Sequence, residues 1–304
     1  MALDPDVILD RRRLKRRITL WRTMTVIAVA ALAALVVGED LARPFARDHV
    51  ASLDIVGIIV GDEATVQALD TVADNDKAQA LIVFIDSPGG TTYGGETLYE
   101  AIGRVRQKKP VVAVIGGLGT SAGYLIALAA DRIVIRQTSV TGSIGVLIET
   151  AEVSRLLDKL GVTTDAVKSG PLKDTPSPLQ PMTREGRAVV QGLVDDSYNW
   201  FVDLVAERRQ LPREAARTLA DGRVYTGRQA IAARLVDELG ATREARRWLE
   251  EHHGIPATLP AKSISLPSAP ESALDWLTGL AKKMVFSERL RLDGLKSVWQ
   301  PDRL

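Results

Sequence analysis

A serine surrounded by small residues is the first candidate for chemistry in this chain. Ser121 stands in the segment Gly-Thr-Ser-Ala-Gly-Tyr (119–124), where a loop is expected to turn into a helix. A serine at a helix start most often caps that helix. A nucleophile at a strained turn also needs neighbours small enough to let a substrate carbonyl approach. In that case the N–H of Ala122 would face the oxyanion that attack produces. The segment alone leaves both interpretations open.

A serine nucleophile needs a base, and histidine is absent from the middle of the chain. The three histidines are His49, His252 and His253, and the sequence has none between them. A lysine can be the base where an apolar, water-poor site favours its uncharged form, and the Ser–Lys dyad is a variant of the catalytic triad. The segment Lys-Ser-Gly-Pro-Leu-Lys-Asp (168–174) offers two lysines after a strand expected at 163–167. Loop lysines are more often solvated charges.

A glycine-rich turn, Asp-Ser-Pro-Gly-Gly (86–90), follows an expected buried strand. Two glycines after a proline leave the main chain free to point N–H groups at an anion. The same pattern is typical of a tight turn between a strand and a helix. A nucleotide phosphate loop is disfavoured because no Lys-Ser or Lys-Thr pair follows the glycines at the required spacing.

Composition excludes several classes of function. The 304 residues carry 39 Lys+Arg against 38 Asp+Glu, a net charge of +1, which argues against a general nucleic-acid binder. The absence of cysteine excludes disulfides, thiolate nucleophiles and iron–sulfur clusters. No motif implies a metal or another cofactor. With 46% hydrophobic residues, the chain can form a sizeable core.

The N-terminus predicts a membrane anchor. Residues 11–17 read Arg-Arg-Arg-Leu-Lys-Arg-Arg, and residues 23–38 carry no charge. With the residues just before it, this run is long enough for a bilayer core of about 30 Å. We therefore expect a basic cytoplasmic segment at 1–17, a transmembrane helix at 18–38 and everything after it outside the cytoplasm. The alternative is a cleaved signal peptide, but its small-x-small site, Ala31-Leu32-Ala33, lies inside the apolar run.

Beyond the anchor, short β-branched runs alternate with helical patterns, which predicts an α/β domain with a parallel sheet. Strands are expected at 52–60, 80–85, 111–115 and 132–136. Helices are expected at 64–73, 95–107, 121–130, 150–160, 183–209 and 227–234. The Pro- and Ser-rich stretch 261–272 predicts a linker, and 273–295 an amphipathic helical tail.

Motifs in the same order as these elements resemble the signal peptide peptidase A family. They are DSPGG (86–90), GLGTSAGYLIALAAD (117–131), TGSIGV (141–146), KSGPLKD (168–174), and GRVYTGRQA followed by LVDELG (222–240). Members of this family are membrane-anchored serine proteases of the crotonase and Clp-protease superfamily. The resemblance implies a β/α spiral fold, with a protease domain at 48–254 followed by the linker and helical tail at 261–304. Each motif occurs once, as in the short form of the family.

The resemblance also implies roles for individual residues. Ser121 corresponds to the nucleophile and Lys173 to the general base. The other implied site residues are the oxyanion donors Gly89 and Ala122 and, as hydroxyls that could orient the lysine amine, Ser143 and Ser169. Leu172 stands where the family usually has an aromatic residue, and Ala122-Gly123 where it usually has paired glycines. These departures concern the shape of the substrate pocket.

The implied substrates are cleaved signal peptides and other short or unfolded peptides, at the inner membrane of a bacterial-type cell with the catalytic domain in the periplasm. One domain of this size is too small to enclose a proteolytic chamber, so a homo-oligomer is expected. In the resembled family the serine and the lysine meet across a domain or subunit boundary, so Ser121 would be served by Lys173 of a neighbour. Two alternatives remain: an acyl-CoA hydratase or isomerase of the same superfamily, and an inactive scaffold in which Ser121 only caps a helix.

Overall fold

The computed structural model describes residues 17, 20–29, 47–264 and 296–298. The chain divides into two units, Met1–Arg47 and Asp48–Leu304, which we describe separately. In the first unit, residues 20–29 are helical and their large apolar side chains are exposed. Within the described residues, no helix is both long enough and apolar enough to cross a membrane. Much of the predicted anchor (18–38) and all of the predicted helical tail (273–295) lie outside the described residues.

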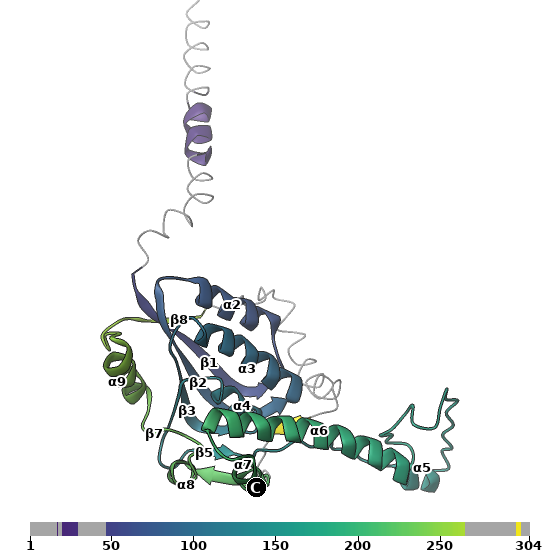
Figure 1. The fold of residues 1–304 in the computed structure, drawn as a ribbon. Helices are drawn as coiled ribbons and strands as arrows, with labels where there is room; N and C mark the ends of the chain where they lie inside the picture. Colours follow the sequence, from purple (N-terminus) through teal and green to yellow (C-terminus); the bar gives the residue numbers. More distant parts are fainter. Residues whose placement is uncertain (1–16, 18–19, 30–46, 265–295, 299–304) are drawn as a thin grey trace, which may run out of the picture. The chain divides into compact units, whose positions relative to one another are not determined.

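One mixed sheet is the centre of the second unit (Figure 1). Its strands in order of sequence are β1 (His49–Ile59), β2 (Ala78–Thr91), β3 (Val111–Thr120), β4 (Arg132–Ile135), β5 (Val140–Gly142), β6 (Val224–Thr226), β7 (Glu238–Leu239), β8 (Ala261–Ser263) and β9 (Lys296–Val298). The main path through the sheet is β6-β5-β3-β2-β1-β8, while β4 pairs with β3 and β7, and β9 pairs with β2. The parallel pairing of β1, β2, β3 and β4 confirms what the alternation predicted.

Helices cover both faces of this sheet. They are α2 (Glu63–Asp74), α3 (Thr92–Arg106), α4 (Ala122–Ala127), α5 (Ser154–Lys159), α6 (Arg184–Arg209), α7 (Arg213–Leu219), α8 (Gly227–Ala232) and α9 (Thr242–His253). Alternate residues of β3 separate the two layers: Val111 and Ala113 pack with α2, α3 and α4, whereas Val112 packs with α9. Burial on both faces explains why the central strands are apolar along their whole length.

Strand β3 changes its partner half-way along, and this places its C-terminal end at the functional site. Val112–Ile115 pair with β4, and Leu118–Thr120 then pair with β5. The strand is therefore longer than the predicted 111–115, and it delivers the chain directly to Ser121. Strand β2 likewise continues through the Asp-Ser-Pro-Gly-Gly segment to Thr91, where a turn out of the sheet was expected.

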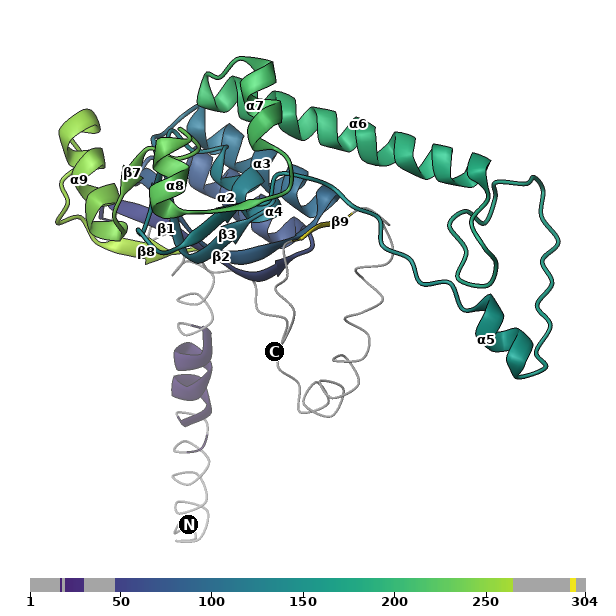
Figure 2. The same ribbon diagram turned by 90° about the horizontal axis from the view of Figure 1, so that it is seen from below.

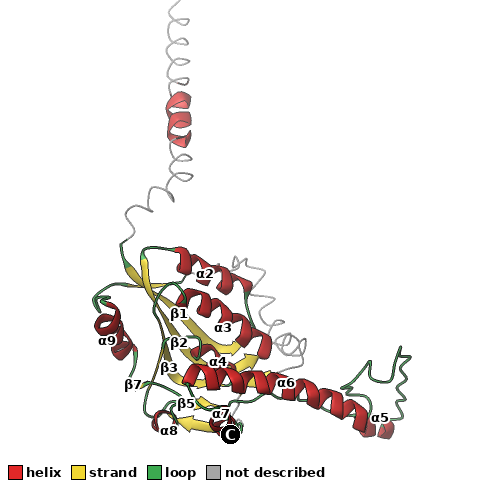
Figure 3. Ribbon diagram, viewed as in Figure 1, coloured by secondary structure: helices red, strands yellow, loops and turns green. Residues whose placement is uncertain are grey.

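An arm leaves the sheet between β5 and the middle of α6. We define it as residues 147–193, which contain α5, its flanking loops and the first part of α6 (Figures 1 and 3). Both ribbon views place α5 and its loops at the far end of α6 from the sheet (Figure 2). The strand predicted at 163–167 is wrong: these residues are all exposed and form no strand. The helix predicted at 150–160 shortens to Ser154–Lys159.

The arm exposes many large apolar side chains. They are Leu147, Leu156, Leu160, Val162, Val167, Leu172, Leu179, Val189 and Leu193. In α6, by contrast, the buried apolar residues Phe201, Val202 and Val205 all lie in the part that packs on the body. An exposed apolar surface of this kind is typical of a surface that meets another protein.

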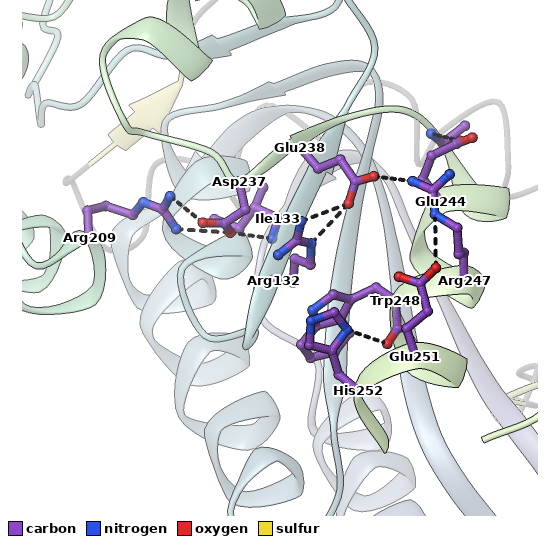
Figure 4. Close-up of polar contacts among 11 residues, drawn as sticks. Arg132, Ile133, Arg209, Asp237, Glu238, Glu244, Arg247, Trp248, Glu251 and His252 are labelled. Atoms are coloured by element: carbon purple, nitrogen blue, oxygen red, sulfur yellow. Dashed lines mark hydrogen bonds and ion pairs between the residues drawn. The ribbon is translucent and has the colours of Figure 1, made fainter. Parts of the chain in front are cut away.

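Two acidic residues of the LVDELG motif, Asp237 and Glu238, form hydrogen bonds that connect elements at one edge of the sheet (Figure 4). Asp237 accepts hydrogen bonds from the main-chain N–H of Ile133 at 2.7 Å and from the guanidinium of Arg209 on α6, at 2.6 Å for the shorter contact. Glu238 accepts from the guanidinium of Arg132 on β4 at 2.9 Å. These bonds connect β4, β7 and α6, so the two acidic residues stabilise the fold.

The predicted linker 261–272 begins within strand β8. Ala261, Lys262 and Ser263 pair with Val50–Ser52 of β1 in parallel register, so this segment extends the sheet. Its prolines, Pro267 and Pro270, come only after the strand, and composition alone assigned the whole stretch to a linker.

Candidate functional site

Ser121 lies at the junction of β3 and α4 in a left-handed main-chain conformation, with φ of 56° and ψ of −118°. Such a conformation costs a residue other than glycine about 1–3 kcal/mol and clusters at active sites. The side chain of Ser121 makes no capping hydrogen bond to α4, so the helix-cap interpretation fails on its main premise. The main-chain N–H donates to the carbonyl of Gly142 at 2.8 Å, which helps to hold the strained turn. Ser121 is 1% exposed.

The small residues after Ser121 allow α4 to pack directly on its neighbours. A Cβ at Gly123 would lie 3.2 Å from the carbonyl oxygen of Ser87 on β2, and a Cβ at Gly95 of α3 would lie 3.1 Å from the Cβ of Ala122. Close approach therefore explains both glycines. Ala122 is the first residue of α4 and is fully buried; a main-chain N–H at this position has no acceptor within its own helix.

The Gly89 N–H, the other oxyanion donor implied by sequence, already has an acceptor in this conformation. Gly89 has φ of 109° and donates its N–H to the Oγ of Ser87 at 3.0 Å. The hydroxyl of Ser87 in turn donates to the carbonyl of Gly57 on β1 at 2.5 Å. Ser87 is fully buried. The Gly89 N–H can therefore reach an oxyanion only if it exchanges Ser87 for the new acceptor.

Two threonines join the Ser121 turn to the loops on either side of it. The hydroxyl of Thr120 donates to the carbonyl of Pro88 at 3.1 Å, and that of Thr141 donates to the carbonyl of Gly119 at 2.7 Å. Both threonines are fully buried. A buried polar group that loses its partner is costly, so these bonds fix the ends of β2, β3 and β5 against one another.

Side-chain hydrogen bonds to distant parts of the chain hold α4. The buried hydroxyl of Tyr124 donates to the carbonyl of Leu235 at 2.8 Å, and burial raises the pKa of Tyr124. At the other end of the helix, the guanidinium of Arg208 from α6 donates to the carbonyls of Leu128 and Ala130, at 2.7 and 2.8 Å. A cation at a helix C-terminus satisfies carbonyls that have no partner within the helix.

Ser143 lies next to the residue that accepts the main-chain hydrogen bond of Ser121. It has φ of 50°, is 8% exposed and directly follows Gly142, whose carbonyl accepts from Ser121. The main-chain N–H of Ser143 donates to the carbonyl of Arg223 at 2.8 Å. The body of the fold thus gathers Ser121, Ala122, the Gly89 segment and Ser143 at neighbouring strand ends.

Lys173 and Ser169 lie elsewhere, on the arm. Both are exposed, whereas a lysine base was expected in a water-poor site. The neighbouring Lys168 forms an ion pair with Asp174 at 2.7 Å, which gives the two lysines of this loop different surroundings. The ribbon views place the arm's loops beyond the far end of α6, while α4 lies on the sheet (Figures 1 and 2).

Comparison with known proteins identifies the family of this chain. The family model of peptidase family S49 matches residues 104–256, half of the chain. The chain belongs to this family. It is accordingly a serine peptidase, and a second family model, that of Clp protease, matches residues 60–141. The S49 chain therefore has a mixed α/β, Clp-protease-like fold with a largely parallel sheet.

Curated relatives support the same assignment. A Synechocystis protein named as a protease is 39% identical over 204 residues, covering 66% of this chain and 73% of the relative. A Methanocaldococcus jannaschii protein named as a protease is 35% identical over 186 residues, 61% of this chain and 60% of the relative. An Enterococcus faecium protein named as the signal peptide peptidase SppA is 34% identical over 178 residues, 58% of this chain and 52% of the relative.

Proposed function

We propose that this S49 chain is an endopeptidase in which Ser121 of one subunit is activated by Lys173 of a neighbouring subunit. The observation that carries the proposal is the contrast between the two residues. Ser121 is buried and strained at the meeting point of three strand ends, while Lys173 is exposed on an arm that leads away from the sheet.

In the proposed reaction, the uncharged amine of Lys173 takes the hydroxyl proton of Ser121, and Oγ attacks the carbonyl carbon of a peptide bond. The negative charge on the carbonyl oxygen is stabilised by the N–H groups of Ala122 and Gly89. The Gly89 N–H becomes available when its hydrogen bond to the Oγ of Ser87 breaks. The lysine then returns the proton to the leaving amine, which leaves an acyl-enzyme that water hydrolyses. Ser143, next in sequence to the acceptor of the Ser121 N–H, is suited to orient the incoming lysine.

The arm supports a contribution from a second subunit. A lysine becomes an effective base when its surroundings exclude water and disfavour its charged form. Lys173 lacks such surroundings within its own chain, and the large apolar side chains around it, such as Leu172 and Leu179, are exposed as well. Packing the arm against another subunit would bury these apolar groups and Lys173 together. It would also help to enclose a site with broad specificity.

The test of the dyad is hydrolysis of an unfolded peptide by single variants. Ser121→Ala and Lys173→Ala should each reduce kcat/KM by about three orders of magnitude or more, since members of a catalytic unit act together. Lys168→Ala is the matched control on the same loop and should matter far less. Near-normal turnover in either dyad variant, with circular dichroism unchanged, would overturn the assignment.

Sharing between subunits is tested by mixing the two inactive variants. When Ser121→Ala and Lys173→Ala chains co-assemble at random in equal amounts, about one quarter of cross-subunit sites pair an intact serine with an intact lysine. Activity should therefore return to about one quarter of the wild-type value per site. A dyad within one chain would leave every site with one lesion, and mixed particles with no regained activity would refute the sharing.

We further propose that the substrates are remnant signal peptides and other short or unfolded peptides at a membrane surface. Support comes from the relative named as a signal peptide peptidase and from the basic and apolar segments at 11–17 and 23–38. We propose that residues 18–38 anchor the chain in a bacterial-type inner membrane, with the catalytic domain in the periplasm. A reporter fused after residue 50 should be active only outside the cytoplasm, with the N-terminal peptide retained. A mature protein starting near residue 40 would show a cleaved signal instead.

A further inference from the structure

Two arginines without acidic partners lie together where helices α3, α4 and α6 meet. Arg106 is the last residue of α3, and Arg208 lies at the end of α6 that packs on the body. The three helices share one apolar core cluster, and Figure 1 shows them on the same side of the sheet. Among the described residues, neither arginine forms an ion pair with a carboxylate. On α3, by contrast, Arg104 pairs with Asp70 at 2.9 Å.

Both unpaired guanidinium groups have N–H donors to spare. The Nε of Arg106 is buried and has no hydrogen-bond partner among the described residues. Arg208 uses its Nε and Nη2 on the carbonyls of Leu128 and Ala130, at the end of α4. Since a guanidinium carries five N–H donors, Arg208 can also serve another acceptor. A buried donor without an acceptor is costly, so an anion that reached this pair would be bound favourably.

A cavity of about 380 Å³ adjoins the two arginines. Residues of α3 and the end of α4 line it, among them Tyr99, Glu100, Arg104, Arg106 and Ala129. Burial raises the pKa of Tyr99, and the positive charges of Arg208 and Arg106 oppose this shift. The phenol and the two guanidinium groups are therefore close enough to act on one another.

The acid in this lining is directed to a different arginine. Glu100 is exposed. The pKa of Arg104 is raised first by its hydrogen bond to Asp70, with a smaller contribution from the charge of Glu100. Burial lowers the pKa of Arg208, and the charge of Arg106 lowers it further. Two like charges thus face one another in a partly buried place, and an anion between them would turn this repulsion into attraction.

We propose that this cavity binds a phosphate group, held by Arg106, Arg208 and the hydroxyl of Tyr99. Guanidinium groups bind phosphate through paired, charge-assisted hydrogen bonds. A phosphate monoester has three strong acceptor oxygens, which suits three donors that come from two helices. A soluble phosphate compound and the headgroup of a phospholipid offer the same chemistry.

The site lies at the other end of α3 from the catalytic residues. Helix α3 begins directly after β2, and its 15 residues span about 22 Å. The chain then enters β3 at Val111, so Arg106 is near the edge where β1, β2 and β3 begin. The proposed anchor at 18–38 precedes β1 by a short segment, which makes a lipid headgroup one source of the phosphate. That source rests on the proposed anchoring, whereas the phosphate site rests on the cavity and its donors.

Thermal unfolding of the full-length chain in a nonionic detergent tests the proposal. The probes, at equal ionic strength, are inorganic phosphate and dioctanoyl phosphatidylglycerol, and dioctanoylglycerol is the matched lipid without phosphate. A ligand that binds only the folded state raises the Tm, so one or both phosphate probes should raise the Tm of the wild type, and dioctanoylglycerol should not. A response to inorganic phosphate would show that free phosphate suffices, and a response to the phospholipid alone would identify the headgroup as the source.

The variant Arg106→Gln should weaken the binding of the responding probe about tenfold or more, because it removes a charge-assisted hydrogen bond. Without a probe, its Tm should equal or exceed that of the wild type, since it removes repulsion from Arg208 and a donor that has no partner. The matched control, Arg104→Gln, removes the same charge from the same helix, but its guanidinium is already paired with Asp70. Arg104→Gln should therefore keep the response to the probe.

This readout needs no catalysis, so failure of the proposed dyad would leave it intact. Absence of a Tm response to both phosphate probes in the wild type, or an equal response in Arg106→Gln, would overturn the proposal. Dissociation of the oligomer in Arg106→Gln, with no response of the wild type to phosphate, would overturn it as well and would assign the arginines to contact with an acidic protein surface.

Discussion

Replacement of Gly90 by alanine tests the close contact between β1 and the Asp-Ser-Pro-Gly-Gly segment. A Cβ on Gly90 would lie 1.7 Å from the carbonyl oxygen of Ile59 and 2.5 Å from its carbonyl carbon. These are main-chain atoms of the residue that pairs with Gly90, so no side-chain rotation relieves the overlap. Overpacking usually costs about 1–3 kcal/mol. Because two paired strands must separate here, we expect Gly90→Ala to lower the free energy of unfolding by about 3 kcal/mol or more.

The matched control is Gly103→Ala on α3. A Cβ at Gly103 meets nothing within 4 Å, and alanine in a helix is more stable than glycine by about 0.5–1 kcal/mol. Urea unfolding followed by circular dichroism should therefore move in opposite directions for the two variants. Peptide hydrolysis by any folded Gly90→Ala protein should fall as well, because Gly89 shares the displaced backbone. Wild-type stability and activity in Gly90→Ala would refute the described contact.

Three further outcomes are expected. Ser87→Ala removes the acceptor of the Gly89 N–H and the donor to the Gly57 carbonyl, and should lower the free energy of unfolding by about 1–3 kcal/mol; an unchanged urea midpoint would contradict this. Since only an uncharged amine accepts a proton, wild-type kcat/KM should rise toward alkaline pH, and Lys173→Arg should be inactive at every pH; an active arginine variant would exclude lysine as base. The pKa of Glu244 is lowered from 4.5 to about 2, mainly by the hydrogen bond from the Ala241 N–H and, second, by the hydrogen bond from the Arg243 side chain. The ionised Glu244 carboxylate therefore stabilises the folded state fully above about pH 4.5, and this contribution is lost as the pH falls toward 2. The Tm difference between wild type and Glu244→Gln should shrink on acidification.

The sheet was predictable because its strands carry an unambiguous pattern. The central runs of β1, β2 and β3 are apolar along their length, and helical patterns separate them, which leaves parallel pairing as the simple solution. Their C-terminal ends were harder to predict. Gly119 and Thr120 lack the apolar character of a central strand, yet they pair with β5. Tertiary pairing, rather than local propensity, extends these strands to the site.

The strand predicted at 163–167 was wrong for a related reason. Thr163–Val167 has the β-branched composition of a strand, but in the described structure it finds no neighbouring strand to pair with. Composition measures how well a segment suits a sheet, and cannot report whether the sheet passes nearby. The short segments β5, β6 and β7 show the converse: two or three residues carry too little pattern to predict, and their partners define them.

At the site, the sequence was enough to identify the motif residues but not the hydrogen-bond partners that hold them in place. The small-residue surround identified Ser121, but its left-handed conformation depends on the Gly142 carbonyl, which lies 21 positions later. Ser87, Thr120 and Thr141 hold the loops through hydroxyl groups whose partners are main-chain carbonyls. Any residue offers a carbonyl, so no pattern in the sequence marks these contacts. Their only signal was position, next to the motifs already singled out.

The two halves of the proposed dyad differ in how they are stabilised, and this has a consequence for regulation. Buried hydrogen bonds among β1, β2, β3 and β5 hold the Ser121 half within one chain. The Lys173 half projects on an exposed apolar arm and lacks the surroundings that a lysine base requires. In the proposed enzyme, the free energy that creates the base therefore comes from association between subunits. Formation of the active site and assembly of the oligomer are then the same event, so a newly made single chain poses no threat to its unfolded neighbours.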